Sequence, residues 1–309
     1  MALRQFKGTY GVSFEEFDVI LSEFGPLVEA AKKEAVAQKW QDKQRIRKEG
    51  GGNKEKLPTS AHKLCFVLYY LKNYPTFDTF GTVFGMSSGH ANKCLHLYWP
   101  FLVKTLDQLD VLPKDSFESL EEFQGYLKQH QIDKILVDAT ERLIERPKNN
   151  QKEFYSGKKK RHTVKNTILS SLSKFVLFIG QTLAGRNHDL TLFRTDFPKE
   201  ENWFELVQLF VDLGYLGLGN DYKAVEIHIP YKKPYKTKNN PESTLTEEQK
   251  QHNKKVSQTR ILVEHAIGGI KRFQCLVVRC RTKKQEFRNQ MIFLAAGIWN
   301  LHLCLKTSN

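Results

Sequence analysis

The feature that most constrains this chain is a short apolar run that ends in an acid, Lys134-Ile-Leu-Val-Asp-Ala-Thr-Glu141. Three consecutive aliphatic residues between polar ones are typical of a strand buried on both faces, although so short a run is also compatible with a helix. Asp138 closes the run. A buried carboxylate must be paired, hydrogen-bonded or bound to a cation. The alternative is a strand-end aspartate that caps a turn.

The composition is that of a folded chain with a basic surface. Its 309 residues suffice for two domains, or for one large domain with an appendage. Because 48 Lys and Arg residues oppose 34 Asp and Glu residues, the net charge is +14. A polyanion is therefore the expected partner, with nucleic acid the first candidate and an anionic membrane the second. A basic charge that serves only solubility is the alternative.

The cysteines and the apolar runs indicate an intracellular protein. Five scattered cysteines favour a reducing compartment, and the one close pair, Cys275 and Cys280, lacks the partners that a structural zinc site needs. The N-terminus has no signal-peptide core, and residues 292–305 are too short and too interrupted for a membrane span. We expect a cytoplasmic protein without a membrane partner, nucleoid-associated in a bacterium or nuclear in a eukaryote.

The N-terminal part of the chain is predicted to be helical. Residues 12–48 carry apolar residues at three- and four-residue spacing, and Gly25-Pro26 is expected to divide this helix in two. Gly50-Gly-Gly52 is the first linker candidate. We therefore predict a helical segment and linker over residues 1–57.

Residues 58–112 have the layout of a helix-turn-helix domain. A helix capped by Ser60 precedes a short helix over residues 77–84, and a glycine turn leads into a third helix over residues 88–109. The first residues of such a helix reach base edges in the major groove. The candidate DNA-binding residues are Ser88, His90, Asn92 and Lys93. An ordinary helical hairpin with solvated polar residues is an equally good interpretation.

A basic tract follows the apolar run. Gly157 is expected to turn the chain so that the next residues enter a strand. The cations of this tract are Lys158, Lys159, Lys160 and Arg161. They can contact a phosphate backbone and so give affinity that depends on salt and not on base sequence. A solvated charged face is the alternative.

Two more acids stand beside predicted elements of the second half. A helix over residues 203–210 leads to Asp212, and a later helix carries Arg260, Glu264 and Lys271 on one stripe. A surface ion pair of little consequence is the alternative on that stripe. Grouped carboxylates repel unless a divalent cation neutralises them, and oxygen-only ligands suit Mg²⁺ or Mn²⁺. Two such ions about 3.5 to 4 Å apart would serve phosphoryl transfer.

Taken in order, these blocks resemble those of DDE-superfamily transposases of insertion sequences, in the branch related to PIF/Harbinger elements. The blocks are Asp138-Ala-Thr140 with Arg146-Pro147, residues 158–164, Gly185-Arg-Asn-His-Asp189, Asp212-Leu-Gly-Tyr215, and Arg260-Ile-Leu-Val-Glu264 with Gly268 and Lys271. The resemblance covers residues 58–300. One departure is the leucine after Asp212, where the family more often has a small or polar residue.

The resemblance implies an α/β fold, an RNase H-like mixed sheet flanked by helices over residues 130–309, preceded by an all-α helix-turn-helix domain. By position, Asp138, Asp212 and Glu264 would be the catalytic, metal-binding triad, with Asp189 as the alternative second acid. Arg260 and Lys271 would orient Glu264 or contact DNA phosphate.

The function implied is DNA transposition. The chain would bind terminal inverted repeats in double-stranded DNA, hydrolyse a phosphodiester with two Mg²⁺ or Mn²⁺ ions and carry out strand transfer, as a homodimer or larger synaptic complex. One alternative is a catalytically inactive, transposase-derived, sequence-specific DNA-binding protein. Another is a metal-dependent nuclease that does not join strands.

Overall fold

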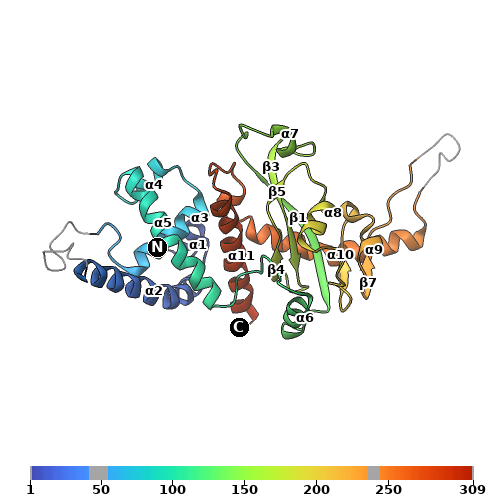
Figure 1. Cartoon of the computed structure of the whole chain (residues 1–309), viewed down its shortest axis with the longest axis horizontal. Coiled ribbons are helices and arrows are strands. Elements are labelled where there is room, and N and C mark those ends of the chain that lie inside the picture. The colour runs from blue at the N-terminus through green and yellow to red at the C-terminus, as the bar shows by residue number, and fades with distance from the viewer. Residues whose placement is uncertain (1, 42–54, 236–243, 308–309) are drawn as a thin grey trace. The chain divides into compact units, whose positions relative to one another are not determined.

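The computed structural model describes residues 2–41, 55–235 and 244–307, which form two compact units (Figure 1). The first unit comprises Met1–Leu112, Lys271–Val278 and Glu286–Asn309, and the second comprises Pro113–Ile270 and Arg279–Gln285. The predicted division into a recognition domain and a catalytic domain concerns function and stays a prediction. The linker candidate at residues 50–52 lies outside the described residues.

The first unit is helical throughout its described residues. Its elements are α1 (Leu3–Tyr10), α2 (Phe14–Gln41), α3 (Ser60–Asn73), α4 (Phe77–Val83), α5 (Ser88–Gln108), the 3-10 helix η2 (Gln274–Leu276) and α11 (Gln285–Thr307). The predicted division at Gly25-Pro26 is wrong, because α2 continues through Pro26. A proline removes one helical hydrogen bond. Burial of Phe24 and Val28 on either side of it offsets that loss.

The connection between α4 and α5 depends on Gly81. A Cβ on this residue would lie 2.5 Å from the carbonyl oxygen of Met86, so only glycine permits the close approach. The Met86 amide donates to the Gly81 carbonyl at 2.9 Å, and the Ser87 hydroxyl accepts from the His90 amide to cap α5. Helix α3 is capped by Thr59 rather than by the predicted Ser60. The two helices and their tight turn match the predicted layout, and their role in DNA recognition stays a prediction.

The second unit is a mixed α/β structure. Its helices are α6 (Leu120–Gln129), α7 (Gln151–Phe154), α8 (Asp189–Asp196), the 3-10 helix η1 (Leu213–Tyr215), α9 (Leu218–Asp221) and α10 (Glu247–Ile270). Its strands are β1 (Lys134–Leu143), β2 (Tyr155–Ser156), β3 (Arg161–Ser170), β4 (Val176–Ile179), β5 (Leu183–Ala184), β6 (Gln208–Phe210) and β7 (Glu226–His228). The seven strands form one sheet.

The sheet has the order β2-β3-β1-β6-β7, and β4 and β5 both pair with β3. Strand β1 is antiparallel to β3 and parallel to β6, and β6 is parallel to β7. Helix α10 packs against β1, β3 and β6. Within the described residues, no helix combines the length and the apolar composition needed to cross a bilayer.

Strand β1 separates two layers of side chains, because successive residues of a strand point to opposite faces. Ile135 and Val137 enter a core that also contains Phe123 of α6 and Phe193 of α8. The side chain of Asp138 points to the opposite face of the sheet, where it forms an ion pair with Arg260 of α10. The apolar run is thus the strand that the sequence predicts, and it presents its acid to the layer that carries α10.

Two predictions in this unit are wrong. Strand β1 continues to Leu143, so Asp138 lies within the strand and not at its end. The strand persists because Arg142, although charged, is buried and donates through Nη2 to Asn166 Oδ1 at 2.9 Å. Residues 203–207 form turns before β6, in place of the predicted helix over residues 203–210. Parallel pairing of β6 with β1 and β7 overrides the local apolar pattern.

Candidate active site

The Asp138 side chain is less exposed than those of Asp189 and Glu264. Its Oδ1 accepts a hydrogen bond from the Ala139 amide at 2.8 Å, and its Oδ2 lies 3.6 Å from Arg260 Nη1. Burial raises the pKa of Asp138 to about 6, the nearby Arg260 charge opposes that rise, and the negative charges of Asp212 and Asp189 add to it. Burial is therefore the main reason that Asp138 holds a proton more tightly than a free aspartate.

Asp212 follows the neighbouring strand β6 by two residues. The parallel register pairs Leu136 with Phe210, and each acid follows its paired residue by two positions. Asp212 also caps η1, because its Oδ1 accepts from the Gly214 amide at 2.7 Å. The turn that ends β6 thus fixes this carboxylate.

Asp189 is brought into the same cluster. It is the first residue of α8, and its Oδ1 lies 3.0 Å from Lys165 Nζ of β3. A Cβ on Gly214 would lie 2.9 Å from both Asp189 Oδ2 and Asp212 Oδ1. The two carboxylate oxygens are therefore no farther apart than twice that distance.

Glu264 is linked to Asp138 by one arginine. Arg260 and Glu264 are one turn apart on α10, and Arg260 Nη2 donates to Glu264 Oε1 at 2.6 Å. The other terminal nitrogen of Arg260 faces Asp138. Helix α10 ends at Ile270, so Lys271 falls beyond it and outside the second unit. The predicted stripe of three residues on one helix is therefore wrong for Lys271.

The donor chemistry of the cluster suits a hard divalent cation. Asp138, Asp189 and Asp212 offer oxygen ligands alone, and a cation beside Asp138 would oppose the rise in its pKa that burial causes and that the charges of Asp212 and Asp189 increase. Within the described residues, however, no three His, Cys, Asp or Glu side chains are placed so as to hold a metal ion together. The Arg260 guanidinium lies between Asp138 and Glu264, where it compensates both carboxylates.

Comparison with known proteins identifies the family. The family model of the DDE superfamily endonuclease matches residues 137–300, which include Asp138, Asp212 and Glu264. The chain belongs to this endonuclease family. Over 309 residues it is 29% identical to the "Probable transposase for insertion sequence element IS702" of Microchaete diplosiphon, covering 99% of this chain and 97% of that protein. No solved structure matches the chain.

The resemblance drawn from the motifs is thereby confirmed at the level of DDE insertion-sequence transposases. The PIF/Harbinger branch and the helix-turn-helix stay predictions. The roles of the individual acids likewise stay predictions, because a family match does not test them.

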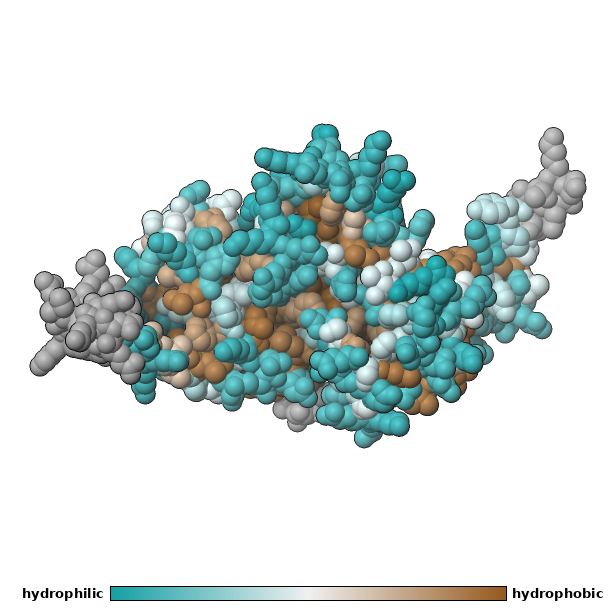
Figure 2. All heavy atoms as spheres, in the orientation of Figure 1, coloured by the Kyte–Doolittle hydropathy of each residue, from teal (hydrophilic) through white to brown (hydrophobic). Residues whose placement is uncertain are grey.

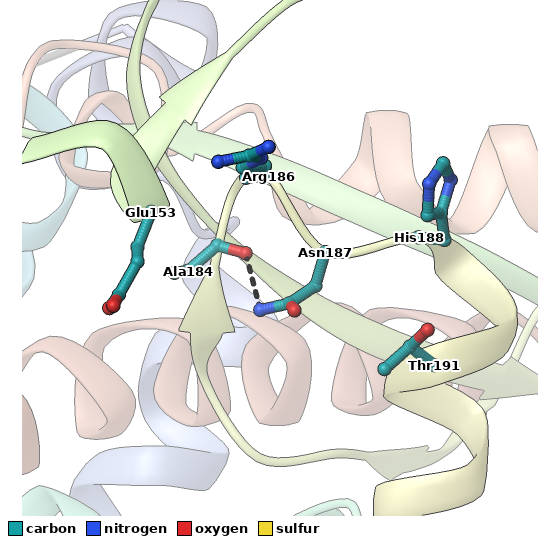
Figure 3. A pocket seen from close by; sticks show the side chains of 6 residues that line it. All are labelled: Glu153, Ala184, Arg186, Asn187, His188 and Thr191. Atoms are coloured by element: carbon teal, nitrogen blue, oxygen red, sulfur yellow. Dashed lines mark hydrogen bonds between the residues drawn. The ribbon is translucent and has the colours of Figure 1, made fainter.

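A pocket of about 320 Å³ adjoins Asp189 in this DDE endonuclease. It is lined by Glu153 of α7, Ala184 of β5, Thr191 of α8 and the loop residues Arg186, Asn187 and His188 (Figure 3). The Asn187 side-chain amide donates to the Ala184 carbonyl at 3.0 Å, and Lys165 Nζ donates to the Asn187 carbonyl at 3.1 Å. The three central residues of the Gly185 to Asp189 block, Arg186, Asn187 and His188, therefore form one wall of the pocket, which their residue types alone do not predict.

The predicted DNA-binding residues lie in two places. Lys158, Lys159 and Lys160 form the turn between β2 and β3, and all three are exposed together with Arg161. The surface over α7 and this hairpin is hydrophilic (Figure 2). In the first unit, Ser88, His90, Asn92 and Lys93 occupy the first turns of α5. There His90 and Lys93 are exposed, and Ser88 and Asn92 are half-buried.

Proposed function

We propose that this DDE endonuclease is a DNA transposase that binds terminal inverted repeats, hydrolyses a phosphodiester at the element end with divalent metal ions, and transfers the freed 3′ end to target DNA. The observation that carries this proposal is that Asp138 lies on β1 and Asp212 follows β6, the parallel neighbour of β1, while Arg260 pairs with both Asp138 and Glu264. The full-length similarity to an insertion-sequence transposase supports the same function.

The mixed sheet supports an RNase H-like core for the second unit. The long antiparallel β1–β3 pair is extended by β4, and the parallel strands β6 and β7 lie on the other side of β1. In this order Asp138 lies on the central strand β1 and Asp212 follows its neighbour β6, which supports the arrangement that the resemblance implies. The helix that carries Glu264 packs across the same strands.

We assign Asp138, Asp212 and Glu264 as the residues that would hold Mg²⁺ or Mn²⁺. When bound, such ions activate a water or hydroxyl nucleophile and stabilise the departing oxygen. Asp212 is preferred to Asp189 as the second acid because Lys165 already compensates Asp189. Arg260 positions both Asp138 and Glu264, since its two terminal nitrogens reach one carboxylate each.

DNA would reach this site along two features of the second unit. The hairpin turn of Lys158 to Lys160 presents cations to a phosphate backbone. The pocket beside Asp189 offers both donors and acceptors, from Arg186 and Glu153, next to the acids. We further propose that α4 and α5 form the helix-turn-helix that recognises the repeats, and that two ends are held by a dimer or larger synaptic complex.

The test is metal-dependent nicking of DNA that carries the ends of the element. Wild type should nick this DNA with Mg²⁺ and give joined product, and Asp138→Asn should bind the same DNA without cleaving it. The matched control is Asp133→Asn, which removes an exposed acid just before β1 and should cleave as wild type does. If wild type binds without cleaving, the protein is a transposase-derived DNA-binding protein. Cleavage without joined product would indicate a nuclease alone.

A further inference from the structure

The first unit contains a pocket of about 520 Å³ that the proposed function does not use. It lies beside α1, which packs against α3 (Figure 1), and its volume is in the range of pockets that bind small organic ligands. Of the described residues that line it, four are cationic and none is acidic. The four are Arg4 and Lys7 of α1, Lys72 of α3, and Arg272, which lies two residues before η2. An anion is therefore the expected ligand.

Gly11 allows these cations to come together. It ends α1 with a φ of +79°, and a Cβ on it would stand 2.5 Å from Phe273 Cε1 and 3.4 Å from Lys72 Cδ. A larger residue would therefore push α1 away from α3 and from the segment that carries Arg272. Lys72 Nζ also donates to the Arg272 carbonyl at 2.8 Å, which joins α3 directly to that segment. These contacts hold the walls of the pocket together.

The chain does not compensate the charges of the pocket. Among the described residues, none of the four cations forms an ion pair with an acid. Burial lowers the pKa of Arg272, and the charge of Glu16 opposes that fall. The Glu16 carboxylate is itself engaged, because it accepts from the Ser13 amide at 2.8 Å and contacts His302 Nδ1. Lys72 uses one of its three ammonium donors within the described residues, so two remain for an external acceptor.

The rest of the wall includes apolar and aromatic side chains. Leu3 and Phe14 line the pocket, and the Phe14 ring is stacked on Phe6 with centroids 4.1 Å apart and planes 18° from parallel. Phe14 is nonetheless 37% exposed, so a planar ring of a ligand can extend this stack. A phosphate monoester carries up to about two negative charges at pH 7. A phosphate joined to a planar base therefore matches both parts of the wall.

We propose that this pocket binds a nucleotide, with the terminal phosphate between Lys72 and Arg272 and the base against Phe14. The site goes beyond the transposase function and does not depend on it. A free nucleotide and the phosphorylated 5′ end of a DNA strand present the same chemistry, a phosphate monoester beside an accessible base. The interior of a duplex does not, because each of its phosphates carries a single charge and its bases lie inside the stack.

The test is isothermal titration calorimetry of the full-length protein with thymidine monophosphate, and with thymidine as the ligand that lacks the phosphate. Thymidine monophosphate should bind once per chain, and thymidine should bind at least about tenfold more weakly. Arg272→Gln and Gly8→Glu should each weaken the binding of thymidine monophosphate about tenfold or more. The first removes a charged donor, and the second adds an acid to the wall of the pocket.

Two control variants lower the net charge by the same amount outside the pocket. Lys104→Gln removes an exposed cation of α5, and Gly125→Glu adds an acid to an exposed position of α6. A Cβ at Gly8 or at Gly125 meets nothing within 4 Å, so both glutamates fit their helices and both variants should melt as wild type does. The two controls should keep the wild-type affinity for thymidine monophosphate.

A single-stranded oligonucleotide distinguishes the two sources of the ligand. If its 5′-phosphorylated form binds more tightly than both thymidine monophosphate and its own 5′-hydroxyl form, and Gly8→Glu abolishes the difference, the ligand is a strand end. If the 5′ phosphate adds nothing to the strand, the ligand is the free nucleotide. The proposal is overturned if the phosphate adds no affinity to either ligand, or if Arg272→Gln or Gly8→Glu binds thymidine monophosphate as wild type does. A wild type that never cleaves DNA refutes the transposase proposal alone, because these titrations need no cleavage.

Discussion

Replacement of Gly214 by alanine would push two carboxylates of the candidate site apart. The Cβ would stand 2.9 Å from Asp189 Oδ2 and from Asp212 Oδ1, whereas ordinary contact begins at 3.4 Å. Each oxygen must therefore move by about half an ångström, the difference between these two distances. Gly214 is not among the glycines with a positive φ, so alanine adds no backbone strain. Displacements of about 1 Å in an active site cost roughly 100-fold in rate, so we expect nicking to fall about tenfold or more.

The assay is single-turnover nicking of end-containing DNA with saturating Mg²⁺, together with the melting temperature of the protein. Gly219→Ala is the matched control, because a Cβ there would meet its nearest neighbour, Ile227, at an ordinary 3.7 Å. Both variants should melt within a few degrees of wild type, and only Gly214→Ala should lose activity. If Gly214→Ala cleaves as fast as Gly219→Ala, the spacing of Asp189 and Asp212 does not matter to the reaction and the assigned site is wrong.

Three further predictions concern charge. Burial raises the pKa of Asp196 to about 6, so the folded protein holds this proton more tightly than the unfolded chain, and stability should fall as pH rises from about 4 to about 6. Asp196→Asn should shrink that fall by on the order of 2–3 kcal/mol in urea unfolding of the metal-free protein, and an unchanged pH dependence would contradict it. Arg260→Gln should raise the pKa of Asp138 further and move the acidic limb of the nicking profile to higher pH, whereas Arg260→Lys should leave the limb in place. Joint replacement of Lys158, Lys159 and Lys160 by glutamine should reduce the salt dependence of DNA binding, measured by fluorescence anisotropy, by about 0.9 in log–log slope for each lost phosphate contact. An unchanged slope of affinity against salt concentration would show that the DNA does not contact these three lysines.

The sequence predicts the elements whose signal is local. The apolar run of β1 and the glycine turn into α5 both depend on neighbouring residues, and the structure contains both. The sequence understates the length of β1, because the hydrogen-bond partner of the buried Arg142 is Asn166 on a different strand. Strand β6 was mistaken for a helix for a similar reason, since only its two parallel neighbours specify it.

The sequence proposes the acids of the candidate site and says little of their environment. Asp138, Asp212 and Glu264 are predicted because each stands in a motif block, and their catalytic roles stay predictions. The place of Asp189 in the same cluster depends on the turn at Gly214, which no spacing in the chain records. The ion pair of Arg260 with Glu264 follows from their spacing of four residues on one helix. The contact of Arg260 with Asp138 joins two elements far apart in the sequence, so no local pattern predicts it.

The distribution of cations gives a physical reason to prefer Asp212 to Asp189 as the second acid. Asp189 forms an ion pair with Lys165, and Asp138 and Glu264 both form ion pairs with Arg260. Among the described residues, Asp212 forms no ion pair and accepts a hydrogen bond only from the Gly214 amide. The leucine that follows Asp212 does not disturb this arrangement, because Leu213 is 41% exposed. The departure from the family pattern at this position therefore falls on the solvent side of the turn. The amide that holds the Asp212 carboxylate belongs to the backbone, which the side chain of residue 213 does not change.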